Sequence, residues 1–144
     1  MRQSAVEDSL SRKQSLLLLG IIILTGFALR VWGISREAAW FDEFTSIVFL
    51  GAPNIFKFLM DNRSIDPATM PLYYSFEYLW AHYVSDSLVG MRMLSVLISL
   101  ATLPVVYAIG AFLSGRRAGL IAAACMALSP IHLHFGQEIR MYVM

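Results

Sequence analysis

An acidic pair, Asp42 and Glu43, stands inside the otherwise apolar and aromatic stretch AAWFDEFTSIVF. Carboxylates are rare in such surroundings unless they are paired, solvated from one side or used in chemistry. Two adjacent carboxylates can hold a divalent cation together, or one can act as a general base while the other orients it. The position of the pair is equally compatible with two solvated loop acids beside an aromatic membrane belt.

A second group of polar side chains lies near the end of the chain: His132, His134, Gln137, Glu138 and Arg140. Ionisable groups near the interior of a membrane helix are functional candidates by default. His134 and Glu138 are one helical turn apart, so they share one face of a helix. With Asp42 they form a weak candidate site for a divalent metal ion, and plain interfacial polarity is the competing explanation.

Three arginines are candidates for binding an anionic lipid headgroup. Arg30 lies at the end of the first apolar run, where it either extends to the headgroups or faces a cavity that receives an anion. Arg140 and Arg92 are the other two candidates. The planar guanidinium donates two hydrogen bonds to phosphate, which makes arginine suited to such a ligand.

Composition indicates an integral membrane protein. The 144 residues are 58% hydrophobic and 15% charged, against about a quarter charged in a soluble domain. The net charge of +1, with scattered basic residues, gives no indication of nucleic-acid binding. The single cysteine, Cys125, excludes a disulfide framework within this chain, and we interpret it as a packing residue.

Three apolar runs predict membrane spans at about 16–34, 93–113 and 118–135, the last rich in small residues that allow close packing. Arg12, Lys13 and the Arg116-Arg117 turn place the N-terminus and the second turn in the cytoplasm. An outer loop at about 35–92 then carries Asp42 and Glu43 on the same extracytoplasmic face as the polar group at the end of the chain. The predicted fold is all-α, with about three transmembrane helices and interfacial helices in this loop.

The segment at 71–84, PLYYSFEYLWAHYV, is too short and too aromatic for a span. We predict an interfacial or re-entrant helix there, with most of its tyrosines anchored at the membrane surface. Glu77, in the middle of this belt, is harder to explain in that way. Three spans ending in polar residues also make a poor closed unit, so we expect residues 1–144 to be the N-terminal part of a larger domain.

Six short motifs follow one another in the order RVWG, WFDE, PLYY, GRRAG, ALSPIH and QEIRMY, over about residues 28–144. Their order resembles the N-terminal part of GT-C glycosyltransferases, in the branch that includes protein O-mannosyltransferases, lipid A aminoarabinose transferases and galacturonosyltransferase-like enzymes. The chain departs from the histidine-containing pattern of many relatives before PLYY, where it has Met70 in ATMPLYY.

The resemblance implies a multipass protein of the cell (inner) membrane that transfers a sugar from a polyprenyl-phosphate donor on the extracytoplasmic face. Asp42 is then the expected catalytic carboxylate and Glu43 its partner. The expected substrate-binding residues are Arg30, Gln137, Glu138 and Arg140. The resemblance leaves open whether a divalent metal ion is the cofactor, which sugar is transferred, and whether the acceptor is a protein, a lipid or a glycan. The alternative is a non-catalytic membrane scaffold that binds lipid phosphate.

Overall fold

The computed structural model describes residues 10–35, 38–67 and 70–140, without the side chains of Asp42, Thr45 and Ser46. The regular elements in these ranges are all helices, which confirms the predicted all-α fold. They are α1 (Arg12–Val31), α2 (Phe41–Ile47), α3 (Ile55–Ile65), α4 (Pro71–Tyr83), α5 (Leu88–Ser114), α6 (Arg116–Leu128) and α7 (Pro130–Phe135).

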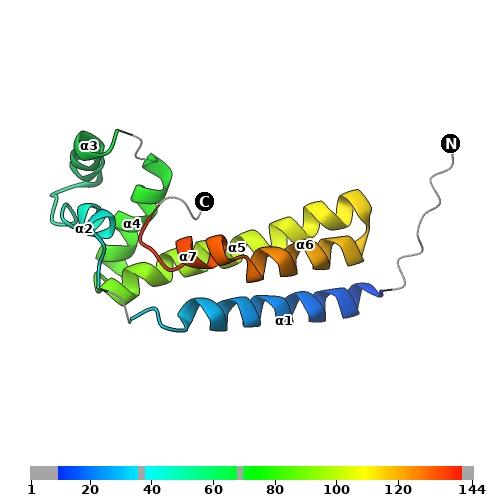
Figure 1. Ribbon diagram of the computed structural model, residues 1–144. Coiled ribbons are helices and arrows are strands. Elements are labelled where there is room, and N and C mark those ends of the chain that lie inside the picture. Colours follow the sequence, from blue (N-terminus) through cyan, green and yellow to red (C-terminus); the bar gives the residue numbers. More distant parts are fainter. Residues whose placement is uncertain (1–9, 36–37, 68–69, 141–144) are drawn as a thin grey trace.

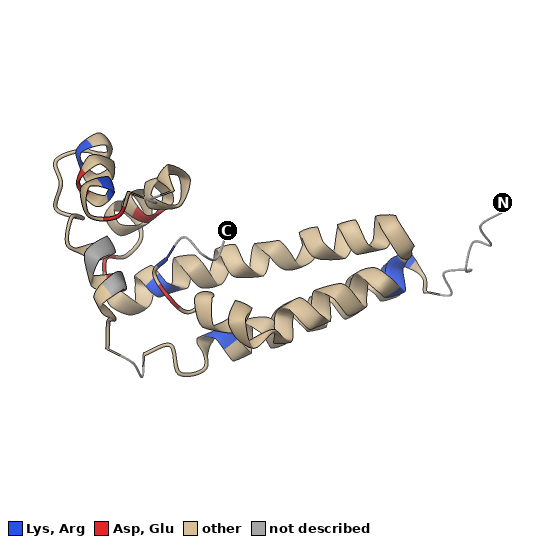
Figure 2. Cartoon of the chain, turned by 45° about the horizontal axis from the view of Figure 1, so that its top comes forward, with Lys and Arg blue, Asp and Glu red and all other residues tan. Residues whose placement is uncertain are grey.

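The long helices α1, α5 and α6 lie side by side, and the short helices α2, α3 and α4 gather at one end of them (Figure 1). The start of α1 and the turn between α5 and α6 lie at the opposite end of this bundle (Figure 1). Charged residues collect at the two ends and on the short helices, whereas the middle of the long helices is uncharged (Figure 2). The fold therefore separates a basic end from an end that carries both polar groups.

Two helices, α1 and α5, are long and apolar enough to cross a membrane. A core helix of a soluble protein would be mostly buried, but only 22% of the apolar window of each is buried. Large apolar side chains instead lie on the surface, among them Leu24 at 69% and Phe112 at 90% exposure. Such surfaces are typical of contact with lipid rather than with water.

The third predicted span is not one helix. The chain breaks at Ser129, which is extended at φ −62° and ψ 121°, and α7 begins at Pro130. Proline has no N–H to donate and its ring disfavours the helical conformation of the preceding residue. The 13 residues of α6 cover only about 20 Å, so they do not cross a hydrocarbon core of about 30 Å without α7.

The turn between α5 and α6 is a single residue, Gly115, with a φ of 88° that favours glycine. Just beyond it the two helices touch through their backbones, because a Cβ on Gly110 would lie 2.8 Å from the Cα of Gly119. The prediction of close packing by small residues in the third run is therefore confirmed. Arg116 donates to the carbonyl of Leu10 at 2.7 Å, which ties this turn to the start of α1.

The predicted short helix at 71–84 is present as α4, with Pro71 in its first turn. The expectation that most of its tyrosines form a surface belt is wrong for two of them. Tyr73 and Tyr74 are buried against Phe58 of α3, and the Tyr73 hydroxyl lies 2.8 Å from the Ser95 hydroxyl of α5. These tyrosines fix α4 to its neighbours.

Candidate functional site

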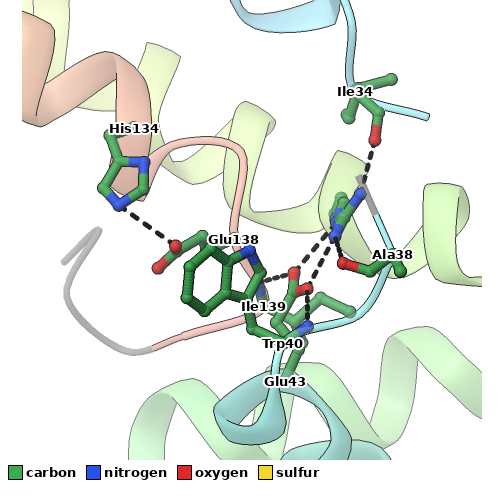
Figure 3. Close-up of polar contacts among 8 residues, drawn as sticks. Ile34, Ala38, Trp40, Glu43, His134, Glu138 and Ile139 are labelled. Atoms are coloured by element: carbon green, nitrogen blue, oxygen red, sulfur yellow. Dashed lines mark hydrogen bonds and ion pairs between the residues drawn. The ribbon is translucent and has the colours of Figure 1, made fainter. Parts of the chain in front are cut away.

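Glu43 is the centre of the polar end of the molecule (Figure 3). It lies in the first turn of α2 and is 1% exposed. Its Oε2 accepts a hydrogen bond from the backbone N–H of Trp40 at 3.2 Å, as acidic side chains do at helix starts. Arg92 of α5 donates to both carboxylate oxygens, from Nε at 2.9 Å and from Nη2 at 2.7 Å. This bidentate pair joins α2 to α5.

The same carboxylate also holds the end of the chain. The backbone N–H of Ile139 donates to Glu43 Oε1 at 3.1 Å, so the WFDE and QEIR segments meet (Figure 3). The prediction that the two polar groups share one face is thus confirmed. Burial by itself would raise the pKa of the Glu43 carboxyl, but hydrogen bonds from Arg92, Ile139 and Trp40 lower it below its ordinary value. Glu43 is an ionised and fully engaged group, suited to positioning rather than to proton transfer.

Asp42 precedes Glu43 in the first turn of α2, but its side chain lies outside the described part of the structure. Its candidate roles as catalytic carboxylate and as metal ligand therefore stay predictions. The backbone at Asp42 is nevertheless held by its neighbour, because Glu43 fixes α2 against both α5 and the end of the chain.

A cavity of about 210 Å³ opens beside the Glu43–Arg92 pair. It is lined by the residues that follow α1, by Trp40 and Arg92, and by the segment after α7. The lining residues are Trp32, Gly33, Ile34, Trp40, Arg92, His134, Gln137 and Glu138. Two of the predicted substrate-binding residues, Gln137 and Glu138, are thus brought to one hollow.

Gln137 has a structural contact as well. Its Nε2 donates to the carbonyl of Arg30 at 2.8 Å and lies 3.3 Å from that of Trp32, so it satisfies the last carbonyls of α1. Glu138 lies 3.2 Å from His134 Nε2, as expected for groups one helical turn apart. No cluster of three or more metal-ligating side chains occurs among the described residues, and the Asp42 side chain is not one of them.

Arg30 is in neither of its two expected places. It is fully buried where α1 meets α5, α6 and α7, so it does not extend to the surface, and it is not among the residues that line the cavity. Its Nε donates to Ser99 Oγ at 2.6 Å and its Nη1 to the carbonyls of Gly26 at 2.9 Å and Ala127 at 3.3 Å. Its Nη2 lies 2.6 Å from Nδ1 of His132. Arg30 thus holds helices together.

The partners of His132 determine its tautomer. Arginine can only donate, so Nδ1 must accept and the proton of the neutral ring lies on Nε2. Nε2 is 3.3 Å from Thr102 Oγ1, which donates to the carbonyl of Ser99 at 2.7 Å. Gly136 leaves room for this network, because a Cβ there would lie 2.8 Å from Ser99 Oγ. Sequence reasoning missed this role. The signal available in the sequence was that one arginine, one histidine and two hydroxyl residues occur within the apolar runs.

Arg140 faces α3 and α4 rather than the cavity. Its Nη2 lies 3.7 Å from Asp66 Oδ2, at the end of α3, and its Nη1 donates to the Tyr74 hydroxyl at 3.4 Å. The predicted substrate-binding residues therefore divide into three groups: Gln137 and Glu138 line the cavity, Arg140 contacts the short helices, and Arg30 lies inside the bundle.

Glu77 of α4 is fully buried, and neither of its carboxyl oxygens has a hydrogen-bond partner in the part of the chain that the structure describes. Burial raises the pKa of this carboxyl well above its ordinary value, although the positive charge of Arg140 opposes the shift. The same burial, with the nearby Glu77, raises the pKa of the Tyr73 hydroxyl. Burial thus favours the protonated, neutral form of Glu77.

A neutral buried acid makes stability depend on pH. The unfolded chain ionises Glu77 above about pH 4.3, so stability falls as the pH rises from there towards the pKa of the folded state. We expect Glu77→Met to raise the free energy of unfolding at pH 8 by about 1–3 kcal/mol, because no polar atom is then buried without a partner. Thermal unfolding in detergent at pH 5 and pH 8 measures this difference, which shrinks at the lower pH.

The exposed Asp86 provides the control, since Asp86→Asn should change the free energy of unfolding by less than about 0.5 kcal/mol at pH 8. A Glu77→Met protein that is less stable than the natural one at pH 8 would show instead that Glu77 is ionised and that it stabilises Arg140.

Comparison of the chain with protein-family models, with curated proteins and with solved structures found no match. The function is therefore argued from the residues and their geometry.

Proposed function

We propose that this chain forms the N-terminal part of an integral membrane glycosyltransferase of GT-C type, which transfers a sugar from a polyprenyl-phosphate donor. The resemblance of six motifs supports the proposal. The observation that carries it is the hydrogen bond from Ile139 to Glu43, which unites the WFDE and QEIR segments at one cavity. Segments distant in sequence converge in this way where they build one site.

The proposed topology puts this site on the extracytoplasmic face of the cell (inner) membrane. The start of α1, which carries Arg12 and Lys13, and the turn between α5 and α6, which carries Arg116 and Arg117, lie at the end of the bundle opposite to the short helices (Figure 1). Basic residues favour the cytoplasmic side, so the N-terminus is cytoplasmic and the cavity is outside.

In the proposed mechanism Asp42 is the general base towards an acceptor hydroxyl. Glu43, held by Arg92, positions the first turn of α2, to which Asp42 belongs. The departing lipid phosphate requires positive charge, for which Arg140 is the proposed source. If a divalent metal ion takes part, Asp42, His134 and Glu138 are the candidate ligands, and the ion would supply further positive charge to the phosphate.

Asp42→Asn tests the proposal in the protein expressed from its complete reading frame. We expect the rate of transfer from a panel of polyprenyl-phosphate sugars to fall by about 10²–10⁴-fold, because asparagine cannot accept the proton. Asp86→Asn, which changes an exposed acid in the same outer loop, is the matched control and should keep full activity. Full activity of Asp42→Asn would exclude the proposed catalytic role.

A non-catalytic lipid-phosphate-binding scaffold is the second candidate. Its non-catalytic character is favoured by the observation that both carboxylate oxygens of Glu43 are held by contacts within the chain, so Glu43 is not available for proton transfer. This candidate predicts that the purified protein binds vesicles containing polyprenyl phosphate but transfers no sugar from any donor of the panel.

A further inference from the structure

One face of α3 forms an apolar groove with the start of α4. The groove has a volume of about 210 Å³ and is lined by Phe56, Leu59, Met60, Arg63 and Pro71. The first four of these residues follow the i, i+3, i+4, i+7 spacing of a single helical face. Phe56 and Met60 are 77% and 67% exposed, so the described part of the chain leaves this face uncovered.

Arg63 is the charged group of the groove. It lies in the last turn of α3, is exposed, and has no hydrogen bond or ion pair with any residue that the structure describes. The acids nearest to it in the sequence already have cationic partners. Asp61 pairs with Lys57 at 2.5 Å, and Asp66 lies 3.7 Å from Arg140. The Arg63 guanidinium therefore keeps its charge and its N–H donors for a ligand, and phosphate matches both.

The position of α3 suits contact with a membrane surface. The helix is displaced to one side of the long helices, near the level at which α5 begins (Figure 1). Because α5 is long and apolar enough to cross a membrane, its start marks the level of the lipid headgroups. The polar residues Lys57, Asp61 and Ser64 lie on a different side of α3 from the groove. Helices with such separate apolar and polar faces lie in the membrane interface.

The chemistry of the groove favours a phospholipid over other occupants. A soluble anion would bind the Arg63 guanidinium but would leave the apolar lining exposed to water. An apolar protein segment would cover the lining but would give Arg63 no anionic partner. A phospholipid supplies both an acyl chain and a phosphate. The volume, below the range of about 300–1,000 Å³ for pockets that enclose a whole ligand, fits a segment of one acyl chain.

We propose that the groove between α3 and α4 binds an anionic phospholipid of the surrounding membrane, with an acyl chain against Phe56 and Met60 and the phosphate on Arg63. A zwitterionic headgroup carries its own cation, which offsets the phosphate, so the groove prefers an anionic one. The bound lipid attaches the short helices to the membrane surface. The groove shares no lining residue with the proposed site of sugar transfer, so the inference does not depend on that activity.

Native mass spectrometry of the complete protein in a neutral detergent tests the proposal. The probes are dioleoyl phosphatidylglycerol and dioleoyl phosphatidylcholine, which have the same acyl chains and differ in net charge. Comparison of natural and variant protein separates the groove from other lipid contacts. Arg63→Gln should weaken binding of the anionic lipid about 3–10-fold, and more than that of the zwitterionic lipid. Met60→Ser should weaken binding of both lipids equally, because it removes apolar contact.

Lys57→Gln is the matched control, because it removes the same charge from the same helix at a position that does not line the groove. It should bind both lipids within about twofold of the natural protein. Equal losses in Arg63→Gln and Lys57→Gln, or no loss in Arg63→Gln, would overturn the proposal. Displacement of the lipid by an equal concentration of inorganic phosphate would do the same.

A photo-crosslinker at Met60 identifies the occupant of the groove in the membrane. Met60 is replaced by p-benzoylphenylalanine in the complete protein, and the membranes are irradiated. We expect an adduct with the mass of a phospholipid. A crosslink to another segment of the chain or to a second protein, or the absence of a lipid adduct, would refute lipid binding in this groove.

Discussion

Arg92→Met is expected to lower the free energy of unfolding by about 3–5 kcal/mol, because it leaves the Glu43 carboxylate buried without its partner. This loss of stability arises because only one member of the buried ion pair is removed. We expect the double variant Glu43→Met/Arg92→Met to recover most of it, since replacing both members by apolar side chains leaves no uncompensated charge. Denaturant titration in detergent, with tryptophan fluorescence as the signal, measures both values.

The pH dependence of this loss has a defined sign. Contacts within the fold lower the pKa of Glu43, so its stabilisation is present above the pKa of the unfolded chain and is lost as the pH falls through the folded value. The gap between Arg92→Met and the natural protein should therefore narrow in acid.

Lys57→Met, which removes an exposed ion pair with Asp61 on α3, is the control and should change stability by less than about 1 kcal/mol. A similar effect of Arg92→Met and Lys57→Met would contradict the central role of Glu43.

Arg30→Met is expected to have the second large effect, a loss of about 2–5 kcal/mol. The substitution keeps an unbranched apolar side chain but removes the donors to Ser99, Ala127 and His132. Limited proteolysis should then cut the chain after α7 more rapidly, because α7 loses its attachment to α1 and α5. Thermal unfolding and the cleavage rate measure the two effects.

Arg30→Lys separates charge from geometry. A single ammonium group cannot reach the four acceptors that the guanidinium serves, so we expect this variant to recover only part of the stability. Arg12→Met, the same change at the exposed start of α1, is the matched control and should be within about 0.5 kcal/mol of the natural protein. Natural stability of Arg30→Met would show that the buried network does not hold α7.

Sequence patterns were sufficient for the features that depend on local composition. The apolar runs predicted α1 and α5, and the length and aromatic content of the 71–84 segment predicted the short helix α4. The distribution of basic residues placed Glu43 and Ile139 on the same face, which their hydrogen bond confirms. Each of these features follows from hydropathy or charge read along the chain.

The features that sequence reasoning missed depend on contacts between distant segments. A charged residue at the end of an apolar run looks the same whether it faces lipid headgroups, a ligand or another helix, and Arg30 proved to face other helices. The break at Pro130 was visible as a residue type, but membrane helices tolerate proline, so hydropathy alone favoured one continuous span. The ion pair between Arg92 and Glu43 could not be predicted either, because the two residues are far apart in the sequence and no local pattern connects them.

The interruption before Pro130 limits which substitutions the chain can accept in evolution. Ala127 is among the last residues of α6, whose carbonyls have no partner within their own helix, and the Arg30 guanidinium supplies one of the missing donors. Arg30 of α1 thus donates a hydrogen bond to a carbonyl at the end of α6, where water would be the donor at a protein surface. A chain that replaced Pro130 and closed the gap would relieve Arg30 of this one carbonyl only, because Ser99, Gly26 and His132 also contact its guanidinium. A chain that keeps the proline keeps the need for a donor at Ala127.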